Sequence, residues 1–456
     1  MKKFGKIIIV PLLLAIFFLV GCGAKETEIE PEEETVRTFA DWTNLKIFQN
    51  IPAMVVQGTR ISKAEDYGGD TYIVGVHGTS LDDYRAYLTL LEREGYEKKV
   101  DNGEEGLSGF VYTSTYMKDK LALTVTYVTK VNITYIAASE KLNLSDHLFY
   151  NESYVADNIA GAKTTLYMPE LHTYGDSYII KMKNGHFLLI DGGMEMDGPY
   201  LFDYLETLVP AGEKPVVEGW FISHGHGDHI GPLTMVVKNA SYADRISVEG
   251  VYYTEPSTAV CKKFGVSVQN VKYGALALKN TAGQSPKMYR PQTGQRYYFN
   301  DIVIDVLHTQ EQLLLGDYEN YFNDSSTWIR LTIDGQTFLT GGDASEGSIN
   351  VVERTYDKEF LTFDLISVFH HGQNVYDSYV NHFTYKTALY PTFLVGSQTA
   401  KHQVEENEIL QKNATECLSW GDGTKVLTFP YVVGSAKSLP MRTWIYHPDR
   451  KTPVPY

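Results

Sequence analysis

The residues with the clearest capacity for chemistry lie in one short run, Ser223-His-Gly-His-Gly-Asp-His229. Its imidazoles and carboxylate, on His224, His226, Asp228 and His229, are the ligand types that bind zinc and similar divalent ions. The glycines between them let the backbone turn tightly enough for neighbouring side chains to share one site. The run therefore predicts a metal centre.

The segments on either side place this run on a loop between a strand and a helix. Residues Val216 to Ile222 are mostly apolar and predict a buried strand. After the run, Ile230, Leu233, Val236 and Val237 recur at helical spacing. Several side chains can converge on one point in such a loop.

Further polar residues of the same ligand types follow apolar, strand-like runs. One run precedes Asp191, another precedes Asp343, and a third precedes the pair His370 and His371. A rigid site is best built from ligands that strand ends deliver. We therefore expect these side chains to join the first cluster.

The His-x-His-x-Asp-His spacing, with Gly175-Asp-Ser177 before it and the Asp343 and His371-Gly372 elements after it, resembles the signature of the metallo-β-lactamase superfamily. The resemblance covers roughly residues 163–440. It implies the α/β class, and within it an αββα sandwich with a two-metal site at one edge.

The resemblance also implies two divalent metal ions, with zinc first and manganese or iron as alternatives. One ion would take His224 and His226, and Asp343 would bridge to the other. Asp191 would support the metal loop from behind, and it is predicted as a catalytic carboxylate together with Asp228. The full predicted ligand set is His224, His226, Asp228, His229, Asp343 and His371, with His370 and His308 as further candidates.

One element departs from the common family pattern. His308 is the only histidine between the cluster and Asp343, and it lies farther upstream than expected. The run Asn323-Asp-Ser-Ser326 lies closer to the expected place. This run resembles the branch that includes the extracellular domain of DNA-uptake competence channels and surface phosphodiesterases such as phosphorylcholine esterase. Either His308 or the Asn323 region would complete the first metal site.

The first residues resemble a bacterial lipoprotein signal. A basic start is followed by the uncharged apolar run Ile7 to Val20, which ends in Leu19-Val-Gly-Cys22. This predicts a signal peptide over residues 1–21, lipidation at Cys22 and an extracytoplasmic, membrane-anchored protein. The acidic residues 22–36 contain almost nothing apolar and predict an unfolded tether.

Two folded regions are expected after the tether. Residues 37–155 predict a small α+β domain of unknown role, with a helix that Ser80 begins and Gly95 ends. Its strands are predicted near Thr71, Val111, Leu121 and Val131. Residues 163–456 predict the metallo-β-lactamase-fold domain.

The net charge of the chain limits the classes of binding partner that we expect. The 456 residues carry a formal net charge of −16, whereas proteins that grip nucleic acid normally show a basic footprint. Nucleic acid is therefore an unlikely partner.

Cys261 and Cys417 could form one disulfide or remain two isolated thiols. Oligomeric state is not predicted.

These features predict a surface-anchored hydrolase that uses a hydroxide held between two ions. The expected substrate is a phosphodiester in a small molecule or a surface polymer. Two alternatives remain open at this stage: a nuclease of the DNA-uptake type, and a binding protein that keeps the fold without the chemistry.

Overall fold

The computed structural model describes residues 42–62, 64–172, 174–265, 269–314, 321–373, 381–392, 404–439, 444–445 and 454–455. The predicted signal peptide, Cys22 and the acidic tether lie outside the described residues. Among the helices that are described, none combines the length and the apolar character needed to cross a membrane.

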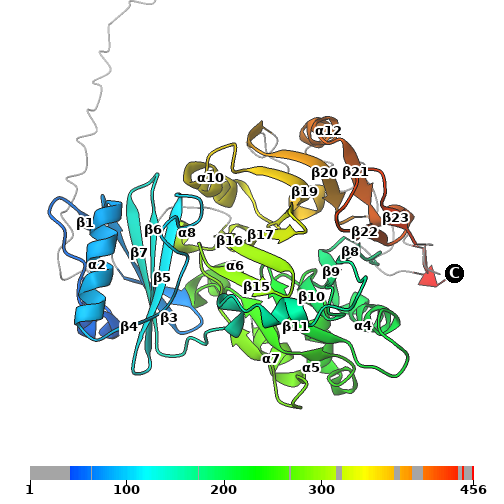
Figure 1. Cartoon of the computed structure of the whole chain (residues 1–456), viewed down its shortest axis with the longest axis horizontal. Coiled ribbons are helices and arrows are strands. Elements are labelled where there is room, and N and C mark those ends of the chain that lie inside the picture. Colours follow the sequence, from blue (N-terminus) through cyan, green and yellow to red (C-terminus); the bar gives the residue numbers. More distant parts are fainter. Residues whose placement is uncertain are drawn as a thin grey trace, which may run out of the picture. The chain divides into compact units, whose positions relative to one another are not determined.

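The amino-terminal region forms an antiparallel sheet with one helix, α2, against it (Figure 1). Helix α2 spans Leu81–Arg93, and the side chain of Ser80 accepts a hydrogen bond from the backbone N–H of Asp83 at its start. Gly95 follows the helix with a φ of 85°, as its predicted role in ending the helix requires. The strands are β1 (Arg60–Ile61), β2 (Glu65–Gly68), β3 (Thr71–His77), β4 (Glu97–Asp101), β5 (Val111–Lys118), β6 (Leu121–Val128) and β7 (Ile133–Ser139).

Two further sheets lie face to face in the rest of the described chain (Figure 1). The first has the order β14-β13-β11-β10-β9-β8-β22-β23, with β12 beside β11. Its strands are β8 (Thr165–Met168), β9 (Ser177–Lys181), β10 (Phe187–Asp191), β11 (Val216–Ile222), β12 (Ser247–Val248), β13 (Gly250–Tyr253), β14 (Lys287–Tyr289), β22 (Lys425–Thr428) and β23 (Lys437–Ser438).

The second sheet runs in the order β15-β16-β17-β18-β19-β20-β21. Its strands are β15 (Arg296–Phe299), β16 (Ile302–His308), β17 (Trp328–Ile333), β18 (Gln336–Thr340), β19 (Thr362–Ser367), β20 (Thr384–Tyr390) and β21 (Glu416–Ser419).

Helices cover the outer face of each sheet (Figure 1). On the first sheet these are α4 (Gly198–Thr207), α5 (Gly231–Lys238) and α7 (Gln269–Ala277), and on the second α10 (Glu346–Thr355) and α12 (Val404–Asn413). The αββα sandwich expected from the sequence is therefore confirmed.

Successive side chains of a strand point to opposite faces of its sheet, so each sheet separates two layers of the apolar core. On β10, Leu188 and Ile190 belong to the core between the two sheets, whereas Phe187 and Leu189 belong to the core beneath the helices. A strand that is buried on both faces is almost continuously apolar. This explains why β10 can carry Asp191 only at its end.

The amino-terminal sheet packs on the sandwich through buried polar contacts as well as apolar ones. Arg290 donates from Nη2 to the carbonyl of Tyr67 at 2.7 Å, and its guanidinium lies 4.2 Å from the centre of the Tyr67 ring. The Tyr67 hydroxyl lies 3.1 Å from Thr309 Oγ1. Phe110 packs edge-on against Tyr356, with ring centres 5.6 Å apart.

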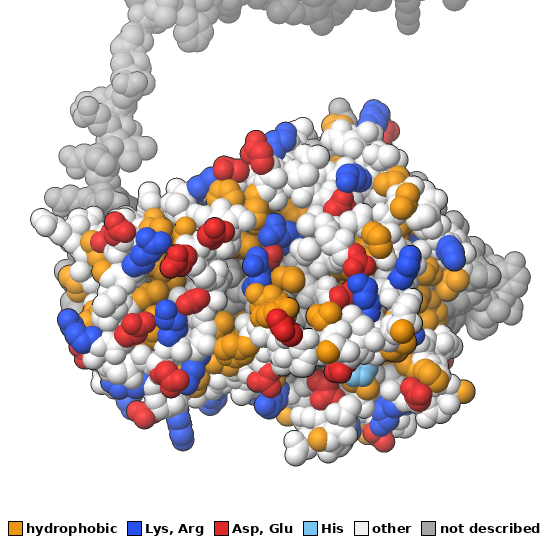
Figure 2. Space-filling model, viewed as in Figure 1, with side chains coloured by type: hydrophobic (Ala, Val, Ile, Leu, Met, Phe, Trp, Pro, Cys, Tyr) orange, Lys and Arg blue, Asp and Glu red, His pale blue; other side chains and the backbone are white. Residues whose placement is uncertain are grey.

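Cys261 and Cys417 are both free, so the disulfide considered from the sequence does not form. On the face shown in Figure 2, acidic and basic side chains are interspersed with small apolar patches.

Candidate metal centre

The metal loop follows β11 and is fixed by its neighbours. Trp220 Nε1 donates to the carbonyl of Asp191 at 2.9 Å, which ties β11 to the end of β10. The N–H of Gly231 donates to the carbonyl of Gly193 at 2.9 Å. A Cβ at Gly231 would lie 1.9 Å from the backbone of Met194, so only glycine allows this approach.

Asp191 organises the loop from behind. Its carboxylate accepts from the backbone N–H of Ser223 at 2.8 Å and from Ser223 Oγ at 2.7 Å. The same carboxylate lies 2.8 Å from Nδ1 of His229. A hydrogen bond at one ring nitrogen sets the tautomer, so with an ion bound Nδ1 would keep its proton and Nε2 would offer its lone pair to the ion.

Four side chains form the first ligand group: Asp228, His229, Asp343 and His371. His229 Nε2 lies 3.0 Å from Asp343 Oδ1, and His371 Nε2 lies 3.2 Å from the same oxygen. Asp228 Oδ2 is 3.1 Å from His371 Nε2. One ligand atom from each residue lies within 4.8 Å of those of the others.

His224, His226 and Asp343 form the second group, so Asp343 belongs to both. His224 Nε2 lies 2.9 Å from His226 Nδ1 and 3.7 Å from Asp343 Oδ2. The two oxygens of Asp343 thus face different groups of imidazoles. This is the arrangement expected of a carboxylate that bridges two ions.

The pair after β19 has an unusual backbone. His370 and His371 have φ values of 50° and 55°, a left-handed conformation that costs a non-glycine residue on the order of 1–3 kcal/mol. This turn brings His371 into the first group, while His370 Nε2 lies 3.6 Å from Asp343 Oδ2. The side chain of His371 is 1% exposed and that of His370 is 18% exposed, so His370 is the one that solvent reaches.

The electrostatics of the cluster follow from burial and close packing. Burial opposes ionisation of Asp343, but the imidazoles of His229 and His371 hold its pKa well below the ordinary value. Burial also opposes the charge on His371, yet Asp343 and Asp228 raise its pKa to about 9. Burial, and then the neighbouring His229, lowers the pKa of His224.

These residues fit a pair of divalent cations. His229 Nε2 and Asp343 Oδ1 are buried and lie 3.0 Å apart, yet neither makes a hydrogen bond of acceptable geometry with a described residue. Buried polar groups normally have partners, and buried carboxylates normally face a cation. Imidazole and carboxylate are ligands suited to zinc, manganese and iron alike.

His308 lies outside the three potential ligand groups found among the described residues. It ends β16, it is 1% exposed, and its Nε2 is 3.3 Å from the carbonyl of Asp324. Asp324 is also outside those groups, because its carboxylate accepts from Ser345 Oγ and from the Ser348 N–H, both at 2.9 Å. The Asn323 region meets the metal loop instead through Thr327, whose N–H donates to the Ser223 carbonyl at 2.8 Å.

Three residues of the site had no assigned role in the sequence. The Asp176 carboxylate faces the His371 imidazole, with Asp176 Oδ1 3.7 Å from His371 Nδ1. Burial raises the pKa of Asp176 to about 7. Ser223 links Asp191 to the loop, and the Phe322 ring lies 4.5 Å from that of His226. The Gly175-Asp-Ser177 motif was the only sequence signal for Asp176.

Comparison with known protein families gives one match. Residues 172–346 match the family model described as the Metallo-beta-lactamase superfamily. This segment, which is less than half of the chain, therefore matches a metallo-β-lactamase superfamily domain. No curated protein matches the chain.

Several solved structures are distantly similar. A HARLDQ-motif mutant of a metallo-beta-lactamase from Cronobacter sakazakii is 18% identical, over 44% of this chain and 74% of that one, with a TM-score of 0.28. The metallo-beta-lactamase fold protein YhfI from Bacillus subtilis is 14% identical over 56% and 95%, with a TM-score of 0.32. The Zn(2+)-bound PqqB from Methylobacterium extorquens is 8% identical over 53% and 84%, also with a TM-score of 0.32. Similarities this distant carry no argument about substrate.

The position of His308 yields a test of whether it is a ligand or part of the core. Burial lowers its pKa to about 4, so below pH 6.5 the unfolded chain binds a proton that the folded chain does not. We expect this group to lower the free energy of unfolding by about 3 kcal/mol as the pH falls from 7 to 4. His308→Gln should remove this contribution of about 3 kcal/mol from the pH dependence of the free energy of unfolding, measured by urea denaturation. Both metal ions should stay bound to the variant.

His382→Gln is the matched control, because the His382 side chain is 50% exposed. It should keep both metal ions, as the wild type does, which shows whether replacing a histidine away from the centre affects metal content. Loss of one ion from the His308→Gln protein, or an unchanged pH dependence, would contradict the core assignment.

Proposed function

We propose that this protein is a metal-dependent hydrolase that cleaves phosphodiesters on the outer side of the cytoplasmic membrane. The observation that carries the proposal is the pair of ligand groups that share Asp343. A protein that only bound a ligand, without catalysis, would not need one buried carboxylate shared between two groups of imidazoles.

Each group would hold one ion through the residues already described. When bound, the two ions would activate water and polarise the scissile phosphoryl oxygen. Asp191 keeps Nδ1 of His229 protonated, so that Nε2 stays available as a ligand atom. Phe322 covers one side of His226 and helps to exclude bulk water from it.

His370 is the residue that we assign to the substrate side. It lies next to Asp343, its side chain is 18% exposed whereas that of His371 is 1% exposed, and burial lowers its pKa. A neutral imidazole at this position can accept a hydrogen bond or take up a proton at Nε2. We expect it to contact the substrate or the leaving group rather than an ion.

The substrate class rests on resemblance and on chemistry. The Asn323-Asp-Ser-Ser326 and His371-Gly372 elements resemble the phosphodiesterase and nuclease branch more than the antibiotic-hydrolysing one. Two ions suit a phosphodiester, because they can stabilise both the attacking and the leaving oxygen. The net charge of −16 weighs against nucleic acid and in favour of a small molecule or a surface polymer.

The first functional test compares substrate classes on one fully metallated preparation. We expect turnover of bis-p-nitrophenyl phosphate to exceed that of a β-lactam, a thioester and a lactone. Asp343→Asn should lower kcat/KM for the phosphodiester by at least about 100-fold, because it disturbs both ligand groups. The matched control is Asp82→Asn, whose side chain is 96% exposed, and it should keep wild-type activity.

Faster turnover of any of the other three substrates would overturn the substrate class. Absence of turnover on all four would count against a hydrolase.

The second functional test concerns the anchor. Lipidation of Cys22 would place the enzyme on the membrane surface, with the acidic residues 22–36 as a spacer. We expect Cys22→Ala to abolish labelling by a fatty-acid analogue and to release the protein from the membrane fraction. A variant that stays as membrane-bound as the wild type would refute lipidation as the anchor.

A further inference from the structure

A second cavity lies at the opposite edge of the first sheet from the metal centre. It has a volume of about 680 Å³, within the range of small-molecule sites. It is lined by residues from β11 and β13, from the turn before β10, and from η2 (Asp146–Leu148) and α3 (Ser153–Ala156). Glu218 lies six residues before His224, on the order of 20 Å along the chain, so the two sites are separate.

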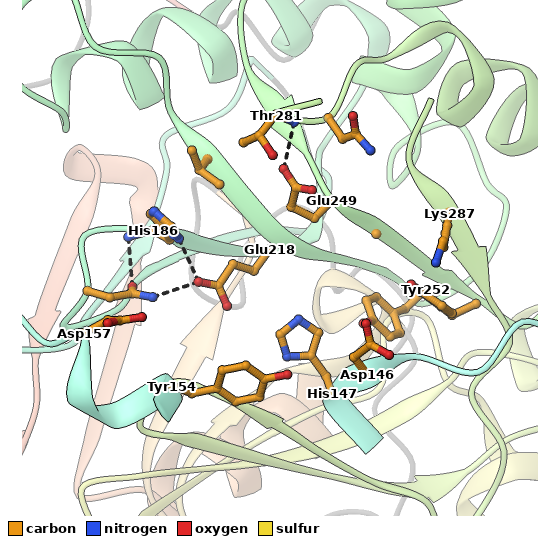
Figure 3. Close-up of a pocket in the computed structure, with 15 residues that line it drawn as sticks. Asp146, His147, Tyr154, Asp157, His186, Glu218, Glu249, Tyr252, Thr281 and Lys287 are labelled. Carbon is orange, nitrogen blue, oxygen red and sulfur yellow. Dashed lines mark hydrogen bonds and ion pairs between the residues drawn. The ribbon is translucent and has the colours of Figure 1, made fainter. Parts of the chain in front are cut away.

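Glu218 is the central polar group of this cavity (Figure 3). It stands in an otherwise apolar strand as the extra residue of a β-bulge, since Phe187 pairs with Val217 and Leu188 pairs with Gly219. Bulges of this kind re-aim a side chain, and they are common beside functional sites. The Glu218 side chain is 14% exposed, so the sheet holds a largely buried carboxylate there.

Among the described residues, only one oxygen of Glu218 has a hydrogen-bond partner. Oε1 accepts from Asn184 Nδ2 at 2.7 Å and lies 2.8 Å from His186 Nδ1. For Oε2, no hydrogen bond from any described residue is found, and in Figure 3 the carboxylate faces the space between His147 and Tyr154. This oxygen is available to a ligand.

Aromatic rings form the walls around that oxygen. His147 donates its Nδ1 proton to the carbonyl of Tyr298 at 2.8 Å, and its ring lies 5.2 Å from that of Tyr154. Tyr289 lies on the other side and packs against Tyr252, with ring centres 5.0 Å apart, while Phe221 stacks on Tyr252 at 4.4 Å. Ring faces attract cations, and Tyr154 and Tyr289 are the partly exposed rings of this wall.

The charge of the lining is negative. Glu218 and Glu249 are partly buried, Asp146 and Asp157 are exposed at the rim, and Lys287 is the one lysine among the lining residues. Burial lowers the pKa of His147, which therefore adds no positive charge at neutral pH. The hydrogen bond to Glu218 raises the pKa of His186, so His186 and Lys287 are the cationic groups set against these four carboxylates. A cation is the complementary ligand.

A bare divalent ion fits this cavity poorly. Among the described residues, all three groups of potential ligands close enough to share an ion lie at the metal centre. The carboxylates of this cavity are too far apart to form such a group. We propose that the cavity binds an alkylammonium group, whose charge meets Glu218 and whose carbon atoms lie against the tyrosine rings.

The test titrates the full-length, metallated protein with choline, ethanolamine and 3,3-dimethyl-1-butanol, the uncharged analogue of choline, by calorimetry. We expect saturable binding of choline, of ethanolamine or of both, and the tighter of the two identifies a quaternary or a primary ammonium group. The neutral alcohol should bind at least about tenfold more weakly than the tighter amine. The proposal would be overturned if the alcohol bound as tightly as the ammonium compounds, or if neither ammonium compound saturated the protein.

Variants assign the binding to this cavity. Glu218→Gln keeps the oxygen that Asn184 and His186 contact and should weaken binding at least about tenfold. Tyr154→Leu should weaken it about two- to fivefold, the loss expected of one cation–π contact. Glu359→Gln, the same charge change at an exposed position, should have no effect.

A hydrolysis assay distinguishes a failure of this proposal from a failure of the proposed function. Glu218→Gln should turn over bis-p-nitrophenyl phosphate like the wild type, because Glu218 does not contact the metal centre. A folded Glu218→Gln protein that still binds the amine normally would contradict the proposal. So would calcium that saturates the same Glu218-dependent site in place of the amine.

Discussion

The burial of Asp343 among four imidazoles is the constraint on which the rest of the structure depends. A carboxylate that is 2% exposed is stable only beside compensating positive charge, and the groups nearest to it are His224, His229, His370 and His371. Asp176, Asp191 and Asp228 add further buried or largely buried carboxylates around the same point. Two bound cations would balance this concentration of negative charge, which explains why the fold tolerates it.

The sandwich supplies the rigidity that this cluster needs. The carboxyl end of β10 carries Asp191, that of β11 leads to the metal loop, and those of β18 and β19 lead to Asp343 and His371. Both sheets have apolar cores on their two faces, so the strand ends are held in register. The strained turn at His370 and His371 persists because this surrounding packing fixes it.

The sequence predicted the parts of this account that depend on local pattern. Motif spacing and apolar runs located Asp191, Asp343 and His371, because Asp191 ends a strand and the other two lie within a few residues of a strand end. The placements of Asp176 and His308 could not be derived in this way, since they depend on how distant strands pair. The cavity at Glu218 was equally hidden, because its lining comes from separate segments that only the folded chain brings together.

A zinc titration of metal-free protein tests the central claim, that Asp343 serves two ions at once. The wild type should bind two ions per chain. Asp343→Asn should weaken both sites, whereas Asp228→Asn, which alters a residue of only one ligand group, should weaken one and leave the other intact. An Asp343→Asn protein that binds both ions like the wild type, or that loses only one, would contradict the shared-carboxylate account.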